Sequence, residues 1–204
     1  MPRPLPQKLA SRSSLPDKRG LILRAAIKVF AGKGYFSSKV ADVAAEAGIA
    51  DGTVYLYFKS KEDILHSIFD RAMAEFIEEG RRELESLDGP AAKLRRIAEL
   101  HLEKLSADRD LAVVFQVELR GSTKFMREFS AAGFSEYLGI ICNSIEEGQK
   151  KGDFRSDIKP IVAAKILYGA LDEMVTNWIL SKKDYPLPPM AGEVMKIYFN
   201  GMMK

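Results

Sequence analysis

The chain has 204 residues, of which 47% are apolar and 29% charged, a balance typical of a globular protein with its own hydrophobic core. It contains no run of eighteen apolar residues, so we expect no membrane-spanning segment and no membrane partner. Cys142 is the only cysteine, which excludes an intrachain disulfide and a cysteine-based zinc cluster.

Residues 1–16 are basic and rich in proline and serine, and they lack the apolar stretch of a secretory signal. We therefore expect a flexible basic arm on a cytoplasmic protein. The net charge of +3 is uneven, because residues 1–60 hold ten Lys or Arg against four Asp or Glu, and residues 61–204 hold twenty-one against twenty-four. Basic charge at one end favours a polyanion such as double-stranded DNA, since each neutralised phosphate releases counterions. A solvated basic arm explains the charge alone at least as well.

Two short helices are predicted near the start of the chain. Helical spacing of apolar residues begins after Asp17, an N-cap type, and stops at Gly34, which predicts a first helix. A second helix follows Ser38 and ends at Gly48, a C-cap glycine. A third piece covers residues 51–57. The two helices joined through Gly48 are typical of a helix-turn-helix.

The third piece carries the side chains expected at DNA. In a helix-turn-helix the second helix enters the major groove, and polar groups around it fix the phosphates. Gly52 lets the backbone approach DNA, Tyr55 and Tyr57 supply phenolic donors, and Lys61 adds a charge. Each has an ordinary structural explanation when taken alone, but together they favour DNA binding. The predicted DNA contacts are Ser37, Ser38, Lys39, Asp51, Gly52, Thr53, Tyr55, Tyr57 and Lys61.

Residues 20–65, with AAIKVFAGKGYFSSKVADVAAEAGIADGTVYLYFKSKEDIL at their heart, resemble the DNA-binding domain of the TetR family of bacterial transcriptional repressors. The resemblance implies an all-α homodimer of about nine helices. It places a helix-turn-helix head at residues 17–60 and a ligand-binding and dimerisation body at residues 61–204. One departure lies at Ala50 and Asp51, where many relatives carry Ser-Lys. We expect Asp51 either to cap its helix or to accept a hydrogen bond from cytosine N4, which leaves the operator sequence open.

The body continues in helical periods. Turn residues at 88–90 and 151–153 separate the predicted helices. Residues 160–181 are apolar on nearly all sides, so we expect them to be buried on several faces, partly against a second subunit. A final helix is predicted at residues 190–203. The last two helices of both subunits are expected to form a four-helix contact that buries Ile166, Ala170 and Tyr198.

The sequence does not favour an enzyme. His66 and His101 are the only histidines and lie on separate predicted helices, so a Ser-His-Asp or Cys-His arrangement has little support. Gly32 and Gly34 form a GxG without a third glycine or a preceding strand, and no P-loop motif occurs. We expect no catalytic residue, no metal site and no cofactor.

The stretches LAVVFQVELRGS and LYGALDEMVTNWIL, with GFSEYLGIICNSIEEGQKKGDF between them, resemble TetR-type regulators of fatty-acid degradation, the FadR type. This resemblance implies that the protein binds a palindromic operator and releases it when long-chain acyl-CoA binds to the protein as the effector. Ordinary bundle core is the alternative for the apolar residues, and surface pairing is the alternative for the cations. The predicted ligand contacts are Phe115, Leu119, Ile141, Leu171, Met174, Val175 and Trp178 for the acyl chain, and Arg109, Arg120 and Lys124 for the CoA phosphates.

Two other functions fit parts of the pattern. A TetR-type repressor that senses another hydrophobic molecule, such as a drug or a flavonoid, would share both the head and the body. A helical adapter that binds only protein would keep the amphipathic body but would not need the tyrosines and lysines of the head. The sequence therefore favours a homodimeric repressor of fatty-acid-degradation genes.

Overall fold

The computed structural model describes residues 17–118, 120–121 and 132–203. Within these residues the chain is all-α, which confirms the predicted fold class. The described elements are α1 (Lys18–Lys33), α2 (Val40–Ala47), α3 (Asp51–Val54), α4 (Lys61–Leu84), α5 (Pro90–Ala107), α6 (Arg109–Val113), the π-helical η1 (Val114–Glu118), α8 (Gly133–Lys151), α9 (Pro160–Leu180) and α10 (Met190–Met202).

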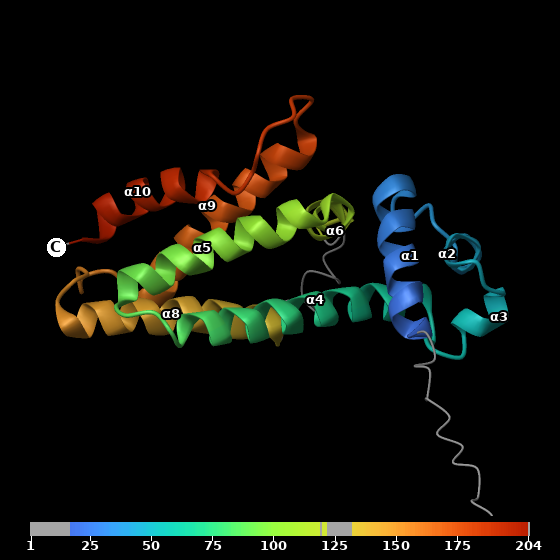
Figure 1. Ribbon diagram of the computed structural model, residues 1–204, viewed down its shortest axis with the longest axis horizontal. Helices are drawn as coiled ribbons and strands as arrows, with labels where there is room; N and C mark the ends of the chain where they lie inside the picture. Colours follow the sequence, from blue (N-terminus) through green and yellow to red (C-terminus); the bar gives the residue numbers. More distant parts are fainter. Residues whose placement is uncertain (1–16, 119, 122–131, 204) are drawn as a thin grey trace, which may run out of the picture.

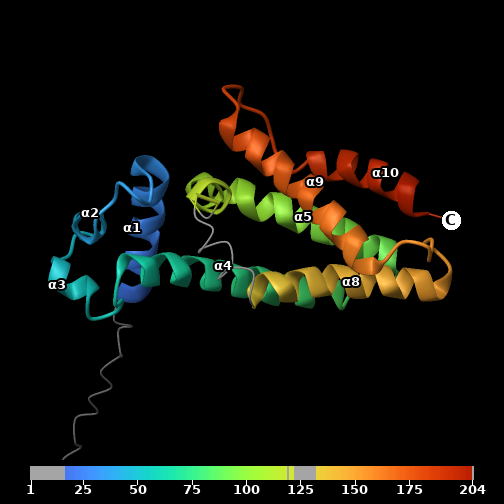
Figure 2. The ribbon, with the colours of Figure 1, turned by 180° about the vertical axis from the view of Figure 1, so that it is seen from behind.

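The helices form a small head and a long body (Figure 1). Helices α1, α2 and α3 gather at one end, and α4 runs from this head into the body, where it lies beside α8. Helices α9 and α10 pack on α5, and the C-terminus lies at the end far from the head. The view from behind shows the same division (Figure 2).

The ends of the head helices follow from local chemistry. The Asp17 carboxylate accepts the Gly20 N–H at 3.0 Å and caps α1. Helix α2 begins one residue later than Ser38 suggested, because the Asp42 carboxylate accepts the Lys39 N–H at 2.7 Å. It ends at Gly48, whose φ of +66° is a left-handed conformation that favours glycine.

Each part has its own hydrophobic core. The head core includes Ile22, Phe30 and Val43 from its first two helices, together with residues from the start of α4. The body core is built from α5, α8, α9 and α10. None of the described helices is both long and apolar enough to cross a membrane. Among the described elements, α4, α6 and η1 all contact α1 of the head and continue into the body.

Candidate DNA-binding surface and ligand cavity

Helix α3 presents a polar and aromatic surface because two apolar side chains fix it to the head. Val54 and Phe58 are buried in the head core. The side chains between them point outward: Tyr55 is 57% exposed, and Tyr57 is also exposed. Leu56 is 81% exposed beside the two tyrosines, and the apolar pattern of the sequence gave no reason to single it out. This surface is free to enter a DNA groove.

The residues around α3 complete the candidate surface. Asp51 and Gly52 are exposed at its start, and a Cβ at Gly52 would meet no atom within 4 Å. Thr53 is half-buried. Helix α3 has no side-chain cap, so the capping role suggested for Asp51 is not seen. Ser37, in the loop before α2, is exposed, as is Lys39 at the start of α2.

Ser38 faces the protein rather than solvent. Its side chain is buried, and its hydroxyl donates to the Gly34 carbonyl at 2.6 Å. A phosphate oxygen accepts hydrogen bonds, so it would need this same proton. The structure therefore gives the Ser38 hydroxyl a role in the loop between α1 and α2, in place of the predicted phosphate contact.

Lys61 holds the same loop. Its ammonium donates to the carbonyls of Tyr35 and Ser38 at 2.7 and 2.8 Å, lies 3.5 Å from the carbonyl of Phe36, and stands 4.4 Å from the centre of the Tyr35 ring. Burial lowers the pKa of Lys61 from its ordinary value. We predicted this ammonium at a phosphate. The structure instead uses its protons to shape the loop that precedes α2.

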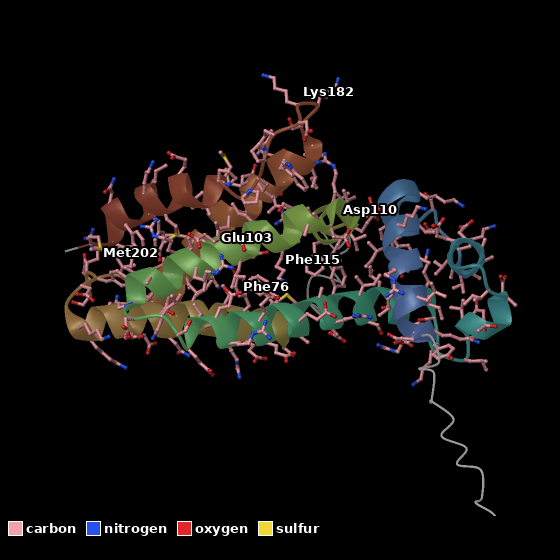
Figure 3. The ribbon with its side chains drawn as sticks, in the orientation of Figure 1. Phe76, Glu103, Asp110, Phe115, Lys182 and Met202 are labelled. Atoms are coloured by element: carbon pink, nitrogen blue, oxygen red, sulfur yellow. The ribbon has the colours of Figure 1, made fainter. Side chains whose placement is uncertain are left out.

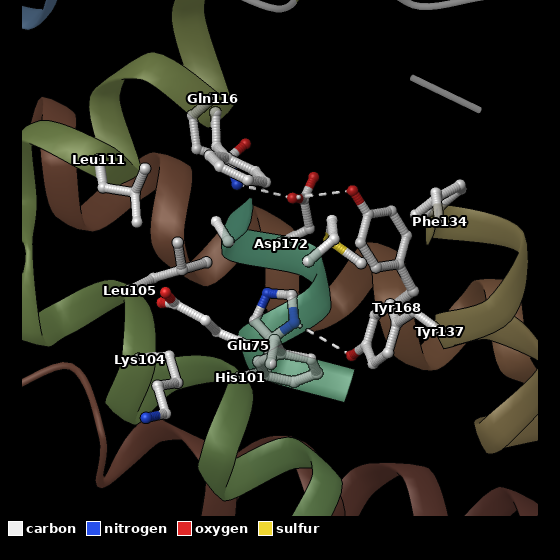
Figure 4. Close-up of a pocket in the computed structure, with 14 residues that line it drawn as sticks. Glu75, His101, Lys104, Leu105, Leu111, Gln116, Phe134, Tyr137, Tyr168 and Asp172 are labelled. Atoms are coloured by element: carbon white, nitrogen blue, oxygen red, sulfur yellow. Dashed lines mark hydrogen bonds between the residues drawn. The ribbon is translucent and has the colours of Figure 1, made fainter. Parts of the chain in front are cut away.

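The body contains a cavity of about 130 Å³ bordered by α4, α5, α6, η1, α8 and α9 (Figure 4). Most of its wall is apolar, and Figure 3 shows Phe76 and Phe115 on the inner side of the molecule, between α4 and α5. The lining residues are Ala72, Met73, Glu75, Phe76, His101, Lys104, Leu105, Leu111, Phe115, Gln116, Phe134, Tyr137, Tyr168 and Asp172.

A polar cluster interrupts this apolar wall. Asp172 is 7% exposed, and its carboxylate accepts from Gln116 Nε2 at 2.6 Å and from the Tyr168 hydroxyl at 3.1 Å (Figure 4). Arg120 also pairs with this carboxylate. The Thr176 hydroxyl donates to Gln116 Oε1 at 3.0 Å. These partners supply the hydrogen bonds without which a buried carboxylate would be costly.

His101, like Gln116 and Asp172, is a buried polar group in the cavity wall, at 7% exposure. Its Nδ1 lies 3.0 Å from the Tyr137 hydroxyl, and its Nε2 has no hydrogen-bond partner among the described residues. Burial lowers the pKa of His101 to about 4, although the charge of Asp172 opposes this shift. The imidazole is therefore neutral at physiological pH.

The predicted ligand residues divide into three groups. Phe115 lines the cavity as expected. Ile141, Leu171, Val175 and Trp178 belong to the packed body core, and Met174 packs against that core. Leu119 and Lys124 lie outside the described residues. Of the described residues predicted at the acyl chain, only Phe115 therefore borders this cavity, because periodicity identifies buried positions but not those that border a void.

The two described arginines predicted at CoA phosphates already have partners. Arg109 donates to the carbonyls of Trp178 and Ile179, at 3.3 and 2.9 Å, and lies 4.5 Å from the Trp178 ring centre. It thus stabilises the C-terminal end of α9, where orphan carbonyls favour a cation. Arg120 pairs with Asp172 beside the cavity. Of the two, only Arg120 pairs with a residue of the cavity wall.

The segment η1 joins the cavity to the head. Val114 is fully buried in the head core, and the Phe115 ring lies 4.7 Å from that of Phe69. The Glu118 carboxylate accepts the Tyr35 N–H at 2.7 Å. Gln116, between them in sequence, reaches Asp172 in the cavity. Gln116 of the cavity polar cluster is therefore two residues along the chain from Val114 and from Glu118, which both contact the head directly.

An exposed helix-turn-helix surface, linked through packed segments to a helical body with a cavity, is the arrangement of a transcription regulator. The model of bacterial regulatory proteins of the tetR family matches residues 22–68, and that of the YsiA-like protein C-terminal region matches residues 69–201. The chain belongs to the TetR family of transcription regulators. Its fold and relatives are those of regulators rather than of enzymes.

Its relatives include regulators of fatty-acid metabolism. The fatty acid metabolism regulator protein of Bacillus subtilis is 35% identical over 89% of this chain and 93% of its own. The structure of the fatty acid degradation regulator FadR from Bacillus halodurans has a TM-score of 0.86 and 34% identity, covering 92% of this chain and 97% of that one. FadR from Bacillus subtilis in complex with stearoyl-CoA has a TM-score of 0.84 and 35% identity, covering 89% and 98%.

The loop contacts of Lys61 lead to a prediction that separates a structural from an electrostatic role. We expect Lys61→Ala to lower the free energy of unfolding by about 1 to 2 kcal/mol, because it removes charge-assisted hydrogen bonds. It should weaken operator binding without changing the slope of log affinity against log salt. The matched variant Lys39→Ala should leave stability unchanged and reduce that slope by about one unit. A reduced salt slope in Lys61→Ala would restore its phosphate role.

The buried His101 makes stability depend on pH. Its folded pKa of about 4 is lower than the unfolded value, so between these values the unfolded chain binds the extra proton. Stability should therefore be fully present above about pH 6.5 and fall towards pH 4, by up to about 1.4 kcal/mol per pH unit. The free energy of unfolding is measured with urea at several pH values and a fixed protein concentration. In His101→Gln its dependence on pH should be weaker by the uptake of one proton. Parallel curves for the two proteins would contradict the shifted pKa.

Proposed function

We propose that the protein represses fatty-acid-degradation genes from a palindromic operator in the cytoplasm, and that long-chain acyl-CoA releases it. The observation that carries this proposal is an apolar cavity in the body whose wall includes η1, the segment that also contacts the head. The 35% identity to a fatty acid metabolism regulator supports the effector class, as does a relative whose structure contains stearoyl-CoA.

The energetics of an acyl chain suit this role. Burying about fourteen methylenes at roughly 0.8 kcal/mol each contributes on the order of 11 kcal/mol, and association offsets several kcal/mol of it. The chain would therefore supply most of the affinity. Release of DNA requires the effector to prefer a body shape that holds the two heads at a wrong separation. Helix α4 and the Glu118 contact with Tyr35 are the routes along which that preference reaches the head.

In this proposal the DNA contacts come from α3 and the start of α2. Tyr55 and Tyr57 donate to phosphates, and Gly52 allows close approach of the backbone. Leu56 joins this set, because an apolar side chain so exposed beside Tyr55 suits contact with a thymine methyl group. Ser37, Lys39, Asp51 and Thr53 remain candidates at the same surface.

A sensor of another hydrophobic molecule is the second candidate. The cavity is small, and His101 and Asp172 make part of its wall polar. A compact ligand with one or two hydrogen-bonding groups would suit these features better than a plain alkyl chain. This alternative keeps the repressor mechanism and changes only the effector.

Titration of the protein–operator complex with acyl-CoA tests the effector. Palmitoyl-CoA and stearoyl-CoA should dissociate the complex in a gel-shift assay, whereas CoA without a tail should not. Leu105→Trp places bulk in the cavity wall, so this variant should bind the operator normally and resist release. The absence of dissociation at saturating C14 to C18 acyl-CoA, or equal potency of tail-free CoA, would favour the second candidate.

A homodimer is needed to place two heads about one helical turn, roughly 34 Å, apart on a palindrome. The outward face of α9 supplies an apolar surface with Val162 and with Ile166, which is 59% exposed, and α10 adds the exposed Ile197. Tyr198 does not join it, because its ring is buried within the subunit and its hydroxyl donates to the Ala163 carbonyl at 3.2 Å. We propose that these faces of α9 and α10 form the dimer contact.

A charge on this face should separate the subunits. We expect Ile166→Asp to sediment as a monomer at micromolar concentration, because it places an unpaired carboxylate in an apolar contact. Tight binding to a palindrome should be lost with it. Lys182→Asp introduces the same side chain at an exposed position beyond the end of α9 and should remain dimeric. An Ile166→Asp dimer with normal operator affinity would place the interface elsewhere.

A further inference from the structure

Another cavity lies beside the ligand cavity, and the two cavities share two side chains of their walls. A second cavity, of about 170 Å³, lies between α4 and the start of α8. Met73 and Phe134 line both cavities, and they are the described residues that the two walls share. Ala74 and Ile77 line only the second cavity. These two shared side chains therefore form a partition between the cavities.

Neither cavity alone has room for a long alkyl chain. An apolar cavity of about 150 Å³ in an engineered protein holds one benzene ring, a group of six carbons. The cavity of about 130 Å³ is slightly smaller than that. A tail of fourteen to eighteen carbons would therefore extend well beyond it. The second cavity is the adjoining space into which such a tail could continue.

The partition is built from side chains that are able to move. Methionine has an unbranched side chain that fills irregular gaps and repacks readily. Gly133, next to Phe134, leaves space at Met73, because a Cβ there would lie 3.1 Å from the Met73 Cβ. Phe134 is an aromatic ring with fewer freely rotating bonds, and it makes an edge contact with Tyr168 at 4.7 Å between ring centres. Met73 is therefore the easier of the two to displace.

Charge favours one direction for an acyl-CoA. The described residues around the second cavity include two carboxylates, Asp70 and Glu136, and no lysine or arginine. Glu136 is paired with Arg81 at 2.7 Å. The described wall of the first cavity also has two carboxylates, Glu75 and Asp172. It differs in holding a cation, Lys104, which pairs with Glu79, and in lying beside Arg120, which pairs with Asp172. The CoA phosphates are favoured at the first cavity, which directs the end of the chain towards the partition.

We propose that Met73 and Phe134 form a displaceable partition that sets the response to acyl-chain length. A short chain stays on the first-cavity side of the partition, and a long chain moves Met73 aside and continues into the second cavity. This inference rests on the proposed acyl-CoA effector and adds the residues that read its length.

Binding of octanoyl-CoA and stearoyl-CoA, measured by calorimetry on the full-length protein, tests the partition. Met73→Ala removes the obstacle, so stearoyl-CoA should bind about tenfold more tightly, with octanoyl-CoA changed less than twofold. Each buried methylene is worth about fourfold in affinity, so two further methylenes would suffice for this gain. Ala74→Phe fills the second cavity from an exposed position on α4 and should weaken stearoyl-CoA at least tenfold while sparing octanoyl-CoA.

Glu78→Phe is the matched control, because it adds the same ring to an exposed position of α4 that borders neither cavity. It should leave both affinities unchanged, and thermal melts should show that all three variants fold. A stearoyl-to-octanoyl affinity ratio that stays within twofold of wild type in both Met73→Ala and Ala74→Phe would overturn the partition alone. Failure of the wild-type protein to bind either acyl-CoA would instead overturn the proposed effector.

Discussion

The five residues of η1 couple the two cores of the molecule. Val114 is buried in the head, Gln116 bonds Asp172 in the body, and the Glu118 carboxylate holds a backbone N–H of the head. A π-helical turn widens the helix by one residue, which changes the directions in which successive side chains point. This turn lets one short segment contact the head core, the cavity and the loop between α1 and α2 at the same time. The relative position of head and body therefore depends on the shape of η1.

Local signals made the head predictable from sequence. The glycine at position 48 adopts the left-handed conformation that its place at a helix end indicated. Val54 and Phe58 fall at the spacing that leaves Tyr55 exposed between them. The roles of Ser38 and Lys61 were not predictable, because their acceptors are backbone carbonyls of a loop. A hydroxyl or an ammonium in a sequence does not reveal whether its protons are already in use.

The cavity was harder to predict for a different reason. Helical periodicity correctly places Leu171 and Val175 on a buried face, but closely packed core and cavity wall have the same apolar composition. Whether neighbouring side chains meet or leave a void is decided by the packing of several helices. The partners of Arg109 illustrate the same limit, because they lie about seventy residues away at the end of α9. Polar residues such as His101 were a better signal, since a histidine on an apolar face needs an explanation.

The contact between Glu118 and Tyr35 uses the main chain of the head and not a side chain. Substitution at residue 35 by any residue other than proline preserves this donor. Because this attachment does not use an exposed side chain of the head, surface residues of the head can change towards new operators while the attachment to the body is kept. Residue 118, by contrast, takes part in this hydrogen bond through its side chain. Exchange of heads between related regulators should consequently be tolerated wherever the recipient body carries an acceptor at that position.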